Sequence, residues 1–257
     1  MRLTFLGTGT SYGIPVIGCD CEVCTSPDPR DRRTRHAALL QDEDTTVLVD
    51  APPELRLQLV RERVARLEGV WVTHCHADHV HGLDDLRAVS ARQKAPLDVH
   101  ASVPCAEILR QRFDYIFSDY RPPTGTTKPE LRLRTYRALD EVGVGSISMK
   151  ALPVDHGPLT VYGFRAGDLG YITDAKRLGP GTREALAGVR VLVLNALWHG
   201  NPHPTHFNVE EAVELAREIN AERTYLTHLT HRLSHARLEG DLPAGIHPAH
   251  DGLSVDF

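Results

Sequence analysis

At the centre of the sequence stands Thr73-His74-Cys75-His76-Ala77-Asp78-His79-Val80-His81-Gly82-Leu83. The apolar residues 69–73 have the composition of a short buried strand, which places the histidines and the aspartate in the loop at its end. Imidazole nitrogens and carboxylate oxygens are the usual ligands of a hydrolytic Zn²⁺ or Mn²⁺ site. His74 and His76 could turn toward one metal ion, whereas the pair Asp78-His79 points toward a second position. A polar surface loop is the alternative, and the ordered spacing after a strand argues against it.

Composition narrows the classes of protein to consider. The chain has 257 residues and a net charge of −5, so no overall basic field draws it to nucleic acid. Apolar residues make up 41% and charged residues 25%, which is ordinary for a soluble globular protein. No segment is long enough to span a membrane, and the first residues lack the pattern of a signal peptide. We therefore expect a cytoplasmic protein without a membrane or nucleic-acid partner.

The five cysteines suggest a metal site more than a disulfide framework, because their number is odd. Three of them lie together in Cys19-Asp20-Cys21-Glu22-Val23-Cys24, and clustered thiolates in the cytosol more often hold a metal ion. A structural Zn²⁺ needs four ligands, so the fourth would come from elsewhere in the fold. Three incidental cysteines in a loop are the alternative. Cys75 and Cys105 are isolated in the sequence, and we predict that they are small buried fillers.

Strands and outer helices are predicted along the whole chain. A helix starting at Pro52-Pro53 would present Leu55, Leu59 and Val60 on one face. Further helices are predicted over 83–92, 108–116 and 209–219, and strands over 3–6, 37–40, 45–49, 97–101, 147–154, 161–165, 170–173, 189–194, 224–227 and 253–255. Two strand-rich halves with outer helices indicate two sheets packed face to face. The prediction is an α/β fold with a single domain over residues 1–257.

Three more candidate ligands each follow a predicted strand: His156, Asp174 and His228. Strand ends are positions at which a rigid scaffold offers side chains to a shared site. Taken singly, a capping aspartate or a hydrogen-bonded core histidine is commoner than a ligand. Together with the four ligand candidates of residues 74–79, they make seven, which is about what two metal ions require.

The order His-x-His-x-Asp-His-x-x-Gly-Leu, then His156, Asp174 and His228, resembles the metallo-β-lactamase superfamily of binuclear hydrolases. The resemblance runs from Leu6-Gly7-Thr8-Gly9-Thr10 to Asp251-Gly252-Leu253. The three-cysteine loop and residues 226–231 resemble the branch of phosphoribosyl 1,2-cyclic phosphate phosphodiesterase, itself similar to tRNase Z. This resemblance implies an αββα four-layer sandwich.

The resemblance also implies roles for individual residues. It implies one metal ion on His74, His76 and His156, a second on Asp78, His79 and His228, and Asp174 as the bridge between them. It further implies that His231 completes a structural Zn²⁺ site with Cys19, Cys21 and Cys24.

Two other residues receive supporting roles. The resemblance implies that His206, in His203-Pro204-Thr205-His206-Phe207-Asn208, acts on the phosphate beside the metals. In the alternative, Asn208 caps the next helix and His206 is merely exposed. Asp50 is expected to steady the loop of residues 74–79, called the metal loop below.

The sequence therefore predicts a binuclear Zn²⁺ or Mn²⁺ phosphodiesterase that hydrolyses a small phosphodiester, with a cyclic one favoured. The nucleophile would be a metal-bridging hydroxide, and Asp78, Asp174 and His206 are the catalytic candidates. A tRNase Z-like nuclease, a lactone or thioester hydrolase and a PqqB-like accessory protein are the alternatives. The complete set of seven ligands favours an enzyme.

Substrate identity and quaternary state are less constrained by the sequence. Residues 195–199 depart from the phosphodiesterase pattern, and we expect His199 and His203 to lie in an exposed loop rather than to line the pocket. The expected partner is the small phosphodiester itself, and a homodimer is allowed.

Overall fold

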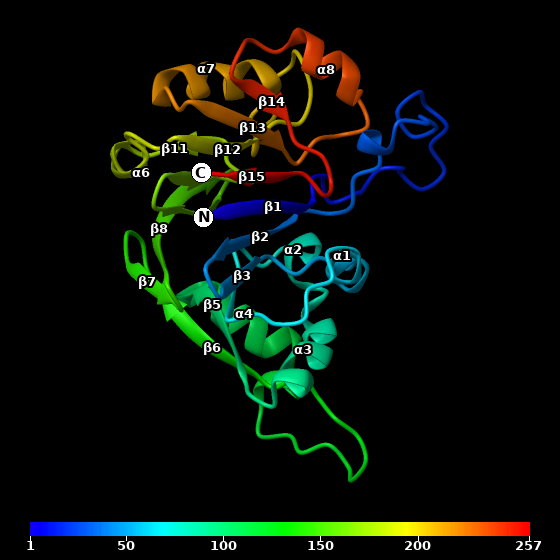
Figure 1. The fold of residues 1–257 in the computed structure, drawn as a ribbon, viewed down its shortest axis with the longest axis vertical. Coiled ribbons are helices and arrows are strands. Elements are labelled where there is room, and N and C mark those ends of the chain that lie inside the picture. The colour runs from blue at the N-terminus through cyan, green and yellow to red at the C-terminus, as the bar shows by residue number, and fades with distance from the viewer.

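Two β-sheets packed face to face form the centre of the computed structural model, which describes all 257 residues (Figure 1). The first sheet has seven strands in the order β15-β1-β2-β3-β4-β5-β6. Their bounds are β1 Arg2–Gly7, β2 Ala37–Asp42, β3 Thr45–Val49, β4 Gly69–Trp71, β5 Leu97–Ser102, β6 Leu131–Tyr136 and β15 Ser254–Asp256. The pairs from β15 to β3 are antiparallel, and those from β3 to β6 are parallel.

The second sheet has eight strands, in the order β11-β8-β9-β10-β12-β13-β14 with β7 paired to β8. Their bounds are β7 Glu141–Val144, β8 Ile147–His156, β9 Leu159–Ala166, β10 Leu169–Tyr171, β11 Arg177–Leu178, β12 Val191–Asn195, β13 Arg223–Thr227 and β14 Ile246–Pro248. The pairs from β10 to β14 are parallel, so the carboxyl ends of β10, β12 and β13 meet at one edge.

Helices cover the outer face of each sheet (Figure 1). The first sheet carries α1 Leu55–Arg61, α2 Ala77–Val80, α3 Leu86–Gln93, α4 Val103–Arg112 and α5 Asp114–Phe117. The second carries α6 Pro180–Ala185, α7 Val209–Ile219 and α8 His235–Asp241. Short 3₁₀ turns lie at Pro29–Asp31 and Leu83–Asp85.

Three apolar clusters fill the spaces between these four layers. One lies between the sheets and includes Phe5, Trp71 and Phe164. The others lie between each sheet and its own helices. Because both faces of each sheet are covered, the strands are apolar on both sides, as the continuous burial of β12 shows. The predicted αββα four-layer sandwich is confirmed.

Several elements differ from the prediction. Helix α1 begins at Leu55, after both prolines, and Val60 is 66% exposed instead of joining Leu55 and Leu59 in the core. The helix predicted over 108–116 is two helices, α4 and α5, which meet at Phe113. The elements that were not predicted are short and partly exposed, which weakens their apolar pattern: strands β6, β7, β11 and β14 and helices α2, α6 and α8.

Candidate metal centre

The predicted ligands gather where strands of both sheets end. His74 and His76 follow β4, and Asp78 and His79 lie in the short helix α2. The second sheet contributes His156 at the end of β8, Asp174 beyond β10 and His228 beyond β13. The site is therefore built across the seam between the two sheets.

Three residues of this region have a left-handed backbone: Asp50 with φ +61°, Asp174 with φ +53° and His228 with φ +56°. Residues other than glycine rarely adopt this backbone conformation, which costs of order 1 kcal/mol or more per residue. The surrounding fold tolerates the cost at three positions of one site. Such clustering is typical of a functional centre.

The ligand atoms form overlapping groups of a size suitable for metal ions. Within each group the nitrogen and oxygen atoms lie no more than 4.8 Å apart. The groups are His74, His76 and His156; His74, His79 and Asp174; and His156, Asp174 and His206. Asp78 and His228 border the second group, since Asp78 Oδ2 lies 3.4 Å from His79 Nε2 and His228 Nδ1 lies 3.4 Å from Asp174 Oδ1. Asp174 is thus the central carboxylate.

Neighbouring groups orient the imidazole rings toward this centre. His79 Nδ1 is 2.7 Å from Asp50 Oδ2, which leaves Nε2 facing Asp78 and Asp174. Asp50 also accepts hydrogen bonds from the backbone N–H and the hydroxyl of Thr73, directly before the metal loop. His156 Nδ1 bonds to the carbonyl of Thr205 at 3.0 Å. Such outer contacts fix which ring nitrogen is offered to a metal ion.

The electrostatics of the centre favour cations. Asp50, Asp78 and Asp174 are all buried, and their ion-pair partners are imidazoles only, without a lysine or arginine. Although burial acts to raise it, the imidazoles of His228 and His79 hold the pKa of Asp174 well below its ordinary value. The site therefore keeps carboxylate charge in a buried place, which is costly without compensating positive charge.

Two buried imidazole nitrogens of the centre are free to bind a metal ion. His79 Nε2 and His228 Nδ1 are buried and have no hydrogen-bond partner. Burial lowers the pKa of His74 well below its ordinary value and that of His228 to about 4, so both rings are neutral at pH 7. The neutral imidazole is the form that binds a metal ion. A buried group with no partner is expensive, and a bound cation would remove that cost.

His206 joins this centre and is not an exposed loop residue. Asn208 does cap α7, in a capping box with Glu211, yet His206 is only 12% exposed and its Nε2 lies 3.3 Å from Asp174 Oδ2. The hydroxyl of Thr205 holds His206 Nδ1 at 2.8 Å. The cap of the alternative is therefore present, but its exposed His206 is not.

The two other histidines of this region differ from each other. His199 is exposed and pairs with Glu210, as expected. His203 is not exposed: it is half-buried and its Nδ1 lies 3.3 Å from that of His206. The expectation for His203 was wrong, because the loop before α7 folds inward over the metal-binding residues.

The ligand atoms of the three clustered cysteines and His231 lie close enough together to hold one metal ion. The sulfur atoms of Cys19, Cys21 and Cys24 lie 3.4, 3.5 and 3.6 Å from His231 Nδ1. Sulfur and nitrogen ligands of one tetrahedral Zn²⁺ are expected about 3.5 Å apart. A hydrogen bond from the backbone N–H of Cys24 lowers the pKa of Cys21 to about 7, whereas burial raises that of Cys24 to about 11. The four residues therefore fit a closed structural site.

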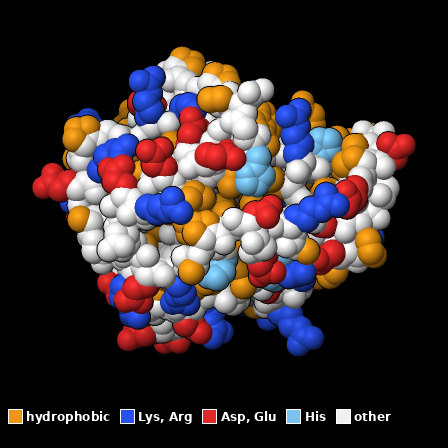
Figure 2. Space-filling view, turned by 90° about the horizontal axis from the view of Figure 1, so that it is seen from above, with side chains coloured by type: hydrophobic (Ala, Val, Ile, Leu, Met, Phe, Trp, Pro, Cys, Tyr) orange, Lys and Arg blue, Asp and Glu red, His pale blue; other side chains and the backbone are white.

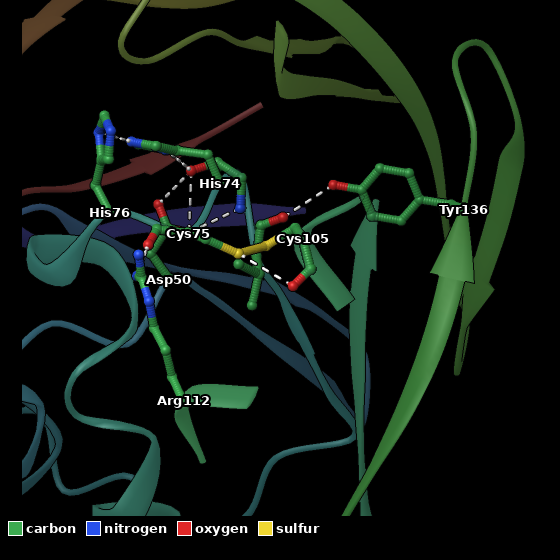
Figure 3. The surroundings of a disulfide bond; sticks show 9 residues. Asp50, His74, Cys75, His76, Cys105, Arg112 and Tyr136 are labelled. Carbon is green, nitrogen blue, oxygen red and sulfur yellow. Dashed lines mark hydrogen bonds between the residues drawn. A yellow bond between two sulfur atoms is a disulfide. The ribbon is translucent and has the colours of Figure 1, made fainter. Parts of the chain in front are cut away.

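Cys75 and Cys105 are joined by a disulfide, which corrects the prediction that they are isolated fillers. Both are buried, as predicted, but the bond links the residue between His74 and His76 to the first turn of α4 (Figure 3). A guanidinium nitrogen of Arg112 donates to the Cys75 carbonyl from the other end of α4. The two cysteines are 30 residues apart and share no motif, so only tertiary structure brings them together.

Asn195 is a site residue that the sequence did not reveal. Its side chain accepts a hydrogen bond from the Ala175 backbone N–H at 2.7 Å and donates to the Ala175 carbonyl at 3.2 Å. These two hydrogen bonds hold the backbone of the residue that follows Asp174, and they thereby help to position the central carboxylate. Its position at the end of β12 was the one available signal, because strand ends line the site.

A family model described as the beta-lactamase superfamily domain matches residues 45–229, which include most of the ligand residues just described. The chain belongs to the beta-lactamase superfamily. The match covers β3 to β13, and it makes this protein a metal-binding hydrolase with the metallo-β-lactamase fold. The recognition of the superfamily from its histidine motif is confirmed.

Individual relatives place this superfamily member more closely. A crystal structure of a diphosphatase from the PhnP family is 36% identical and superposes with a TM-score of 0.92, covering 100% of this chain and 97% of that one. Human tRNase Z, short form, has a TM-score of 0.68 at 18% identity over 100% and 99% of the two chains, which shows a common fold. A protein of Porphyromonas gingivalis named octanoyltransferase is 35% identical over 99% of this chain.

The chain spans about half the length or less of the curated relatives that it matches, with 51% of the Porphyromonas protein covered. None of the helices combines the length and the apolar character needed to cross a membrane.

Proposed function

We propose that this protein is a binuclear metal-dependent hydrolase of a small phosphodiester, with a cyclic ester favoured. The observation that carries the proposal is the buried centre of imidazoles and carboxylates around Asp174, with His206 beside it and no lysine or arginine paired to it. The 36% identity to a diphosphatase over nearly the whole chain supports chemistry at phosphorus rather than at a carboxyl carbon.

The superfamily motif suggests which residues would hold the ions, and the grouping of His74, His76 and His156 supports the first of the two sets. His74, His76 and His156 would hold one cation, Asp78, His79 and His228 the other, with Asp174 between them. When bound, Zn²⁺ or Mn²⁺ would lower the pKa of a coordinated water and offset negative charge on the phosphoryl oxygens. A further Zn²⁺ on the cysteine cluster and His231 would tie the N-terminal loop beside this centre.

His206 is proposed to serve the leaving group. Hydrolysis forms a bond between phosphorus and a water oxygen and breaks the bond to the ester oxygen, which must gain a proton. His206 Nε2 faces the centre, and the Thr205 hydroxyl fixes the opposite ring nitrogen. An imidazole held this way can deliver a proton from Nε2 to the departing oxygen.

A diphosphate is the second candidate substrate, favoured by the activity in the description of the 36% identical relative. A diphosphate also presents a phosphorus atom with a bridging oxygen to be released, so the same residues could serve both reactions. A diphosphate leaving group is the weaker base, and it depends less on proton donation. The relative effect of replacing His206 should therefore separate the two substrates.

We favour a small molecule over nucleic acid as the partner. The net charge is −5, and Figure 2 shows acidic and basic side chains mixed over one face of the molecule. Binding to a phosphate backbone relies on clustered basic residues. A nuclease of the tRNase Z kind is therefore the less favoured alternative. We also propose that the protein is cytoplasmic, and a homodimer is allowed.

The experiment is a substrate panel with purified protein loaded with Zn²⁺ or Mn²⁺. It includes bis(4-nitrophenyl) phosphate, a cyclic nucleotide, ribose cyclic phosphate, a dinucleoside diphosphate, a lactone and a thioester. We expect turnover of phosphorus substrates that is lost in His74→Ala. Efficient lactone or thioester cleavage with every phosphorus substrate untouched would overturn the proposal.

A further inference from the structure

An apolar pocket of about 220 Å³ lies directly beside the metal-binding histidines. His74 and His76 form one wall, and the Cys75–Cys105 disulfide forms another. The remaining lining residues come from both halves of the sandwich, with Ile108 on α4 and Leu159 at the start of β9. Nothing in the predicted chemistry of the centre accounts for this pocket.

Its apolar walls are unusual for a surface next to a polar centre. Leu159 is 47% exposed and Ile108 is 38% exposed, and they line one opening. Single exposed apolar residues are common, but a joint apolar lining beside reactive groups indicates a binding pocket. Polar lining is limited to Ser102, Thr160 and Arg112 besides the histidines.

We propose that this pocket receives an apolar substituent of the substrate, such as an aryl or short alkyl ester group, while the phosphoryl group lies at the metal-binding residues. The inference rests on the proposed function and narrows its substrate class. The occupant is part of the substrate because the pocket is continuous with His74 and His76, so a ligand at these histidines can extend into it.

The dimensions and the rigidity of the pocket suit such a group. A protein cavity of about 150 Å³ lined by apolar side chains binds benzene, so 220 Å³ has room for a phenyl ring. The disulfide and the hydrogen bond from Arg112 to the Cys75 carbonyl both hold α4 against the metal loop (Figure 3). A pocket that is already formed loses little conformational entropy on binding.

The first test compares binding of phenylphosphonate and methylphosphonate to the Zn²⁺-loaded protein by calorimetry. Both ligands carry the same phosphonate group, so the ratio of their affinities measures the contribution of the apolar pocket. We expect phenylphosphonate to bind at least about tenfold more tightly, because each buried carbon adds up to about a fourfold gain in affinity. Equal affinities would overturn the inference.

Two variants locate the effect. Leu159→Ser and Ile108→Ser should each reduce the phenyl preference severalfold and leave methylphosphonate binding unchanged. Val60→Ser is the matched control, because Val60 is an exposed apolar residue on α1 outside this pocket. An unchanged preference in both pocket variants would contradict the assignment even if the wild type prefers phenylphosphonate.

A second readout needs neither metal nor turnover. In the metal-free protein, an uncharged aryl probe such as toluene should shift the methyl NMR signals of Leu159 and Ile108 and leave those of Val60 in place. If phosphodiesters are not hydrolysed but the phenyl preference and these shifts are found, the pocket is right and the proposed reaction is wrong. If phosphodiesters are hydrolysed with no preference and no shifts, the pocket assignment fails alone.

Discussion

His79 shows at the scale of one residue how the centre is arranged. Its ring lies among three carboxylates, Asp50, Asp78 and Asp174, and is fully buried. Burial lowers its pKa, but the carboxylates outweigh that effect and raise the pKa well above the ordinary value. The proton on His79 in the metal-free protein therefore occupies the place in which a cation is expected, and metal binding should release it.

His206 offers the most direct test of a catalytic side chain. His206→Ala should lower kcat on a phosphodiester with a poor leaving group by roughly 10²- to 10⁴-fold, the usual contribution of a general acid. Metal content should stay the same, because His206 is not among the proposed principal ligands. Steady-state kinetics and elemental analysis measure the two quantities.

His199→Ala is the control for His206, since it removes an exposed histidine of the same region. It should retain activity near the wild-type value. A His206→Ala variant with wild-type kcat, or one that has lost metal, would show that His206 has a different role.

The buried residue His235 should make stability depend on pH. Burial, with a smaller effect of Arg30, lowers its pKa to about 4 in the folded protein, compared with 6.5 ordinarily. As pH falls from 6.5 to 4, the unfolded chain gains a proton that the folded protein does not bind. The free energy of unfolding should therefore fall in this window, by at most about 1.4 kcal/mol per pH unit, and level off below it.

Urea unfolding of the wild type and His235→Gln between pH 7 and pH 4 measures this contribution. The variant should lose less stability over the window, while acid effects on the metal-binding residues are common to both proteins. Parallel curves for the two proteins would rule out His235 as the source.

At the scale of elements, the disulfide ties α4 to the metal loop. Opening it by Cys105→Ser should lower the free energy of unfolding by about 3–4 kcal/mol, because a link across 30 residues restricts the unfolded chain. Denaturant unfolding without reductant measures the loss. With reductant, the free energy of unfolding of the wild type should approach that of the variant. A loss of stability that reductant causes in both proteins would come from the other cysteines. Equal stability under oxidising conditions would contradict the link.

The N-terminal loop is the second element whose position depends on a distant partner. Cys19→Ser should lower the metal content by about one ion per chain, since a structural Zn²⁺ needs its four ligands. Elemental analysis after desalting provides the measurement. His199→Ala serves as the control, because it removes an exposed histidine outside the cluster and should keep the full metal content. Identical contents in all three proteins would exclude the cysteine site.

Two elements show when the local sequence pattern is enough to predict a helix or strand and when it is not. Helix α7 was predicted with its observed bounds, Val209–Ile219, because its apolar face and its capping residue are both local signals. Strand β6 was not predicted, although Leu131 and Tyr136 are buried at its ends. Two of its exposed arginines pair with Asp98 on β5, so its stability depends on a neighbour that its own sequence does not display.

For the whole molecule, metal binding and folding should be coupled. Ligands from both sheets meet at one centre, so the arrangement exists only in the folded state. At a free metal concentration of 100 times Kd, binding adds about 2.7 kcal/mol to the free energy of unfolding. For a chain of this size we expect chelation to lower Tm by roughly 5–10 °C.

Calorimetry with and without a chelator, followed by metal addition, tests this coupling. Asp174→Asn should show a smaller shift, because it weakens the carboxylate proposed to serve both ions. A Tm that does not respond to chelation in the wild type would show that the centre is preformed and holds no ion of stabilising affinity.

The sequence alone determined the layers of the fold and most of the residues of the centre. Apolar periodicity is a local property, and the motif of residues 74–79 and the strand-end positions of His156, Asp174 and His228 are legible along the chain. Tertiary structure alone decided that Cys75 meets Cys105, that His203 turns inward, that Asn195 secures Ala175 and that Leu159 faces Ile108 across a pocket. Each of these contacts joins segments whose separation in the sequence carries no periodic signal, so packing of the two sheets and their loops sets them.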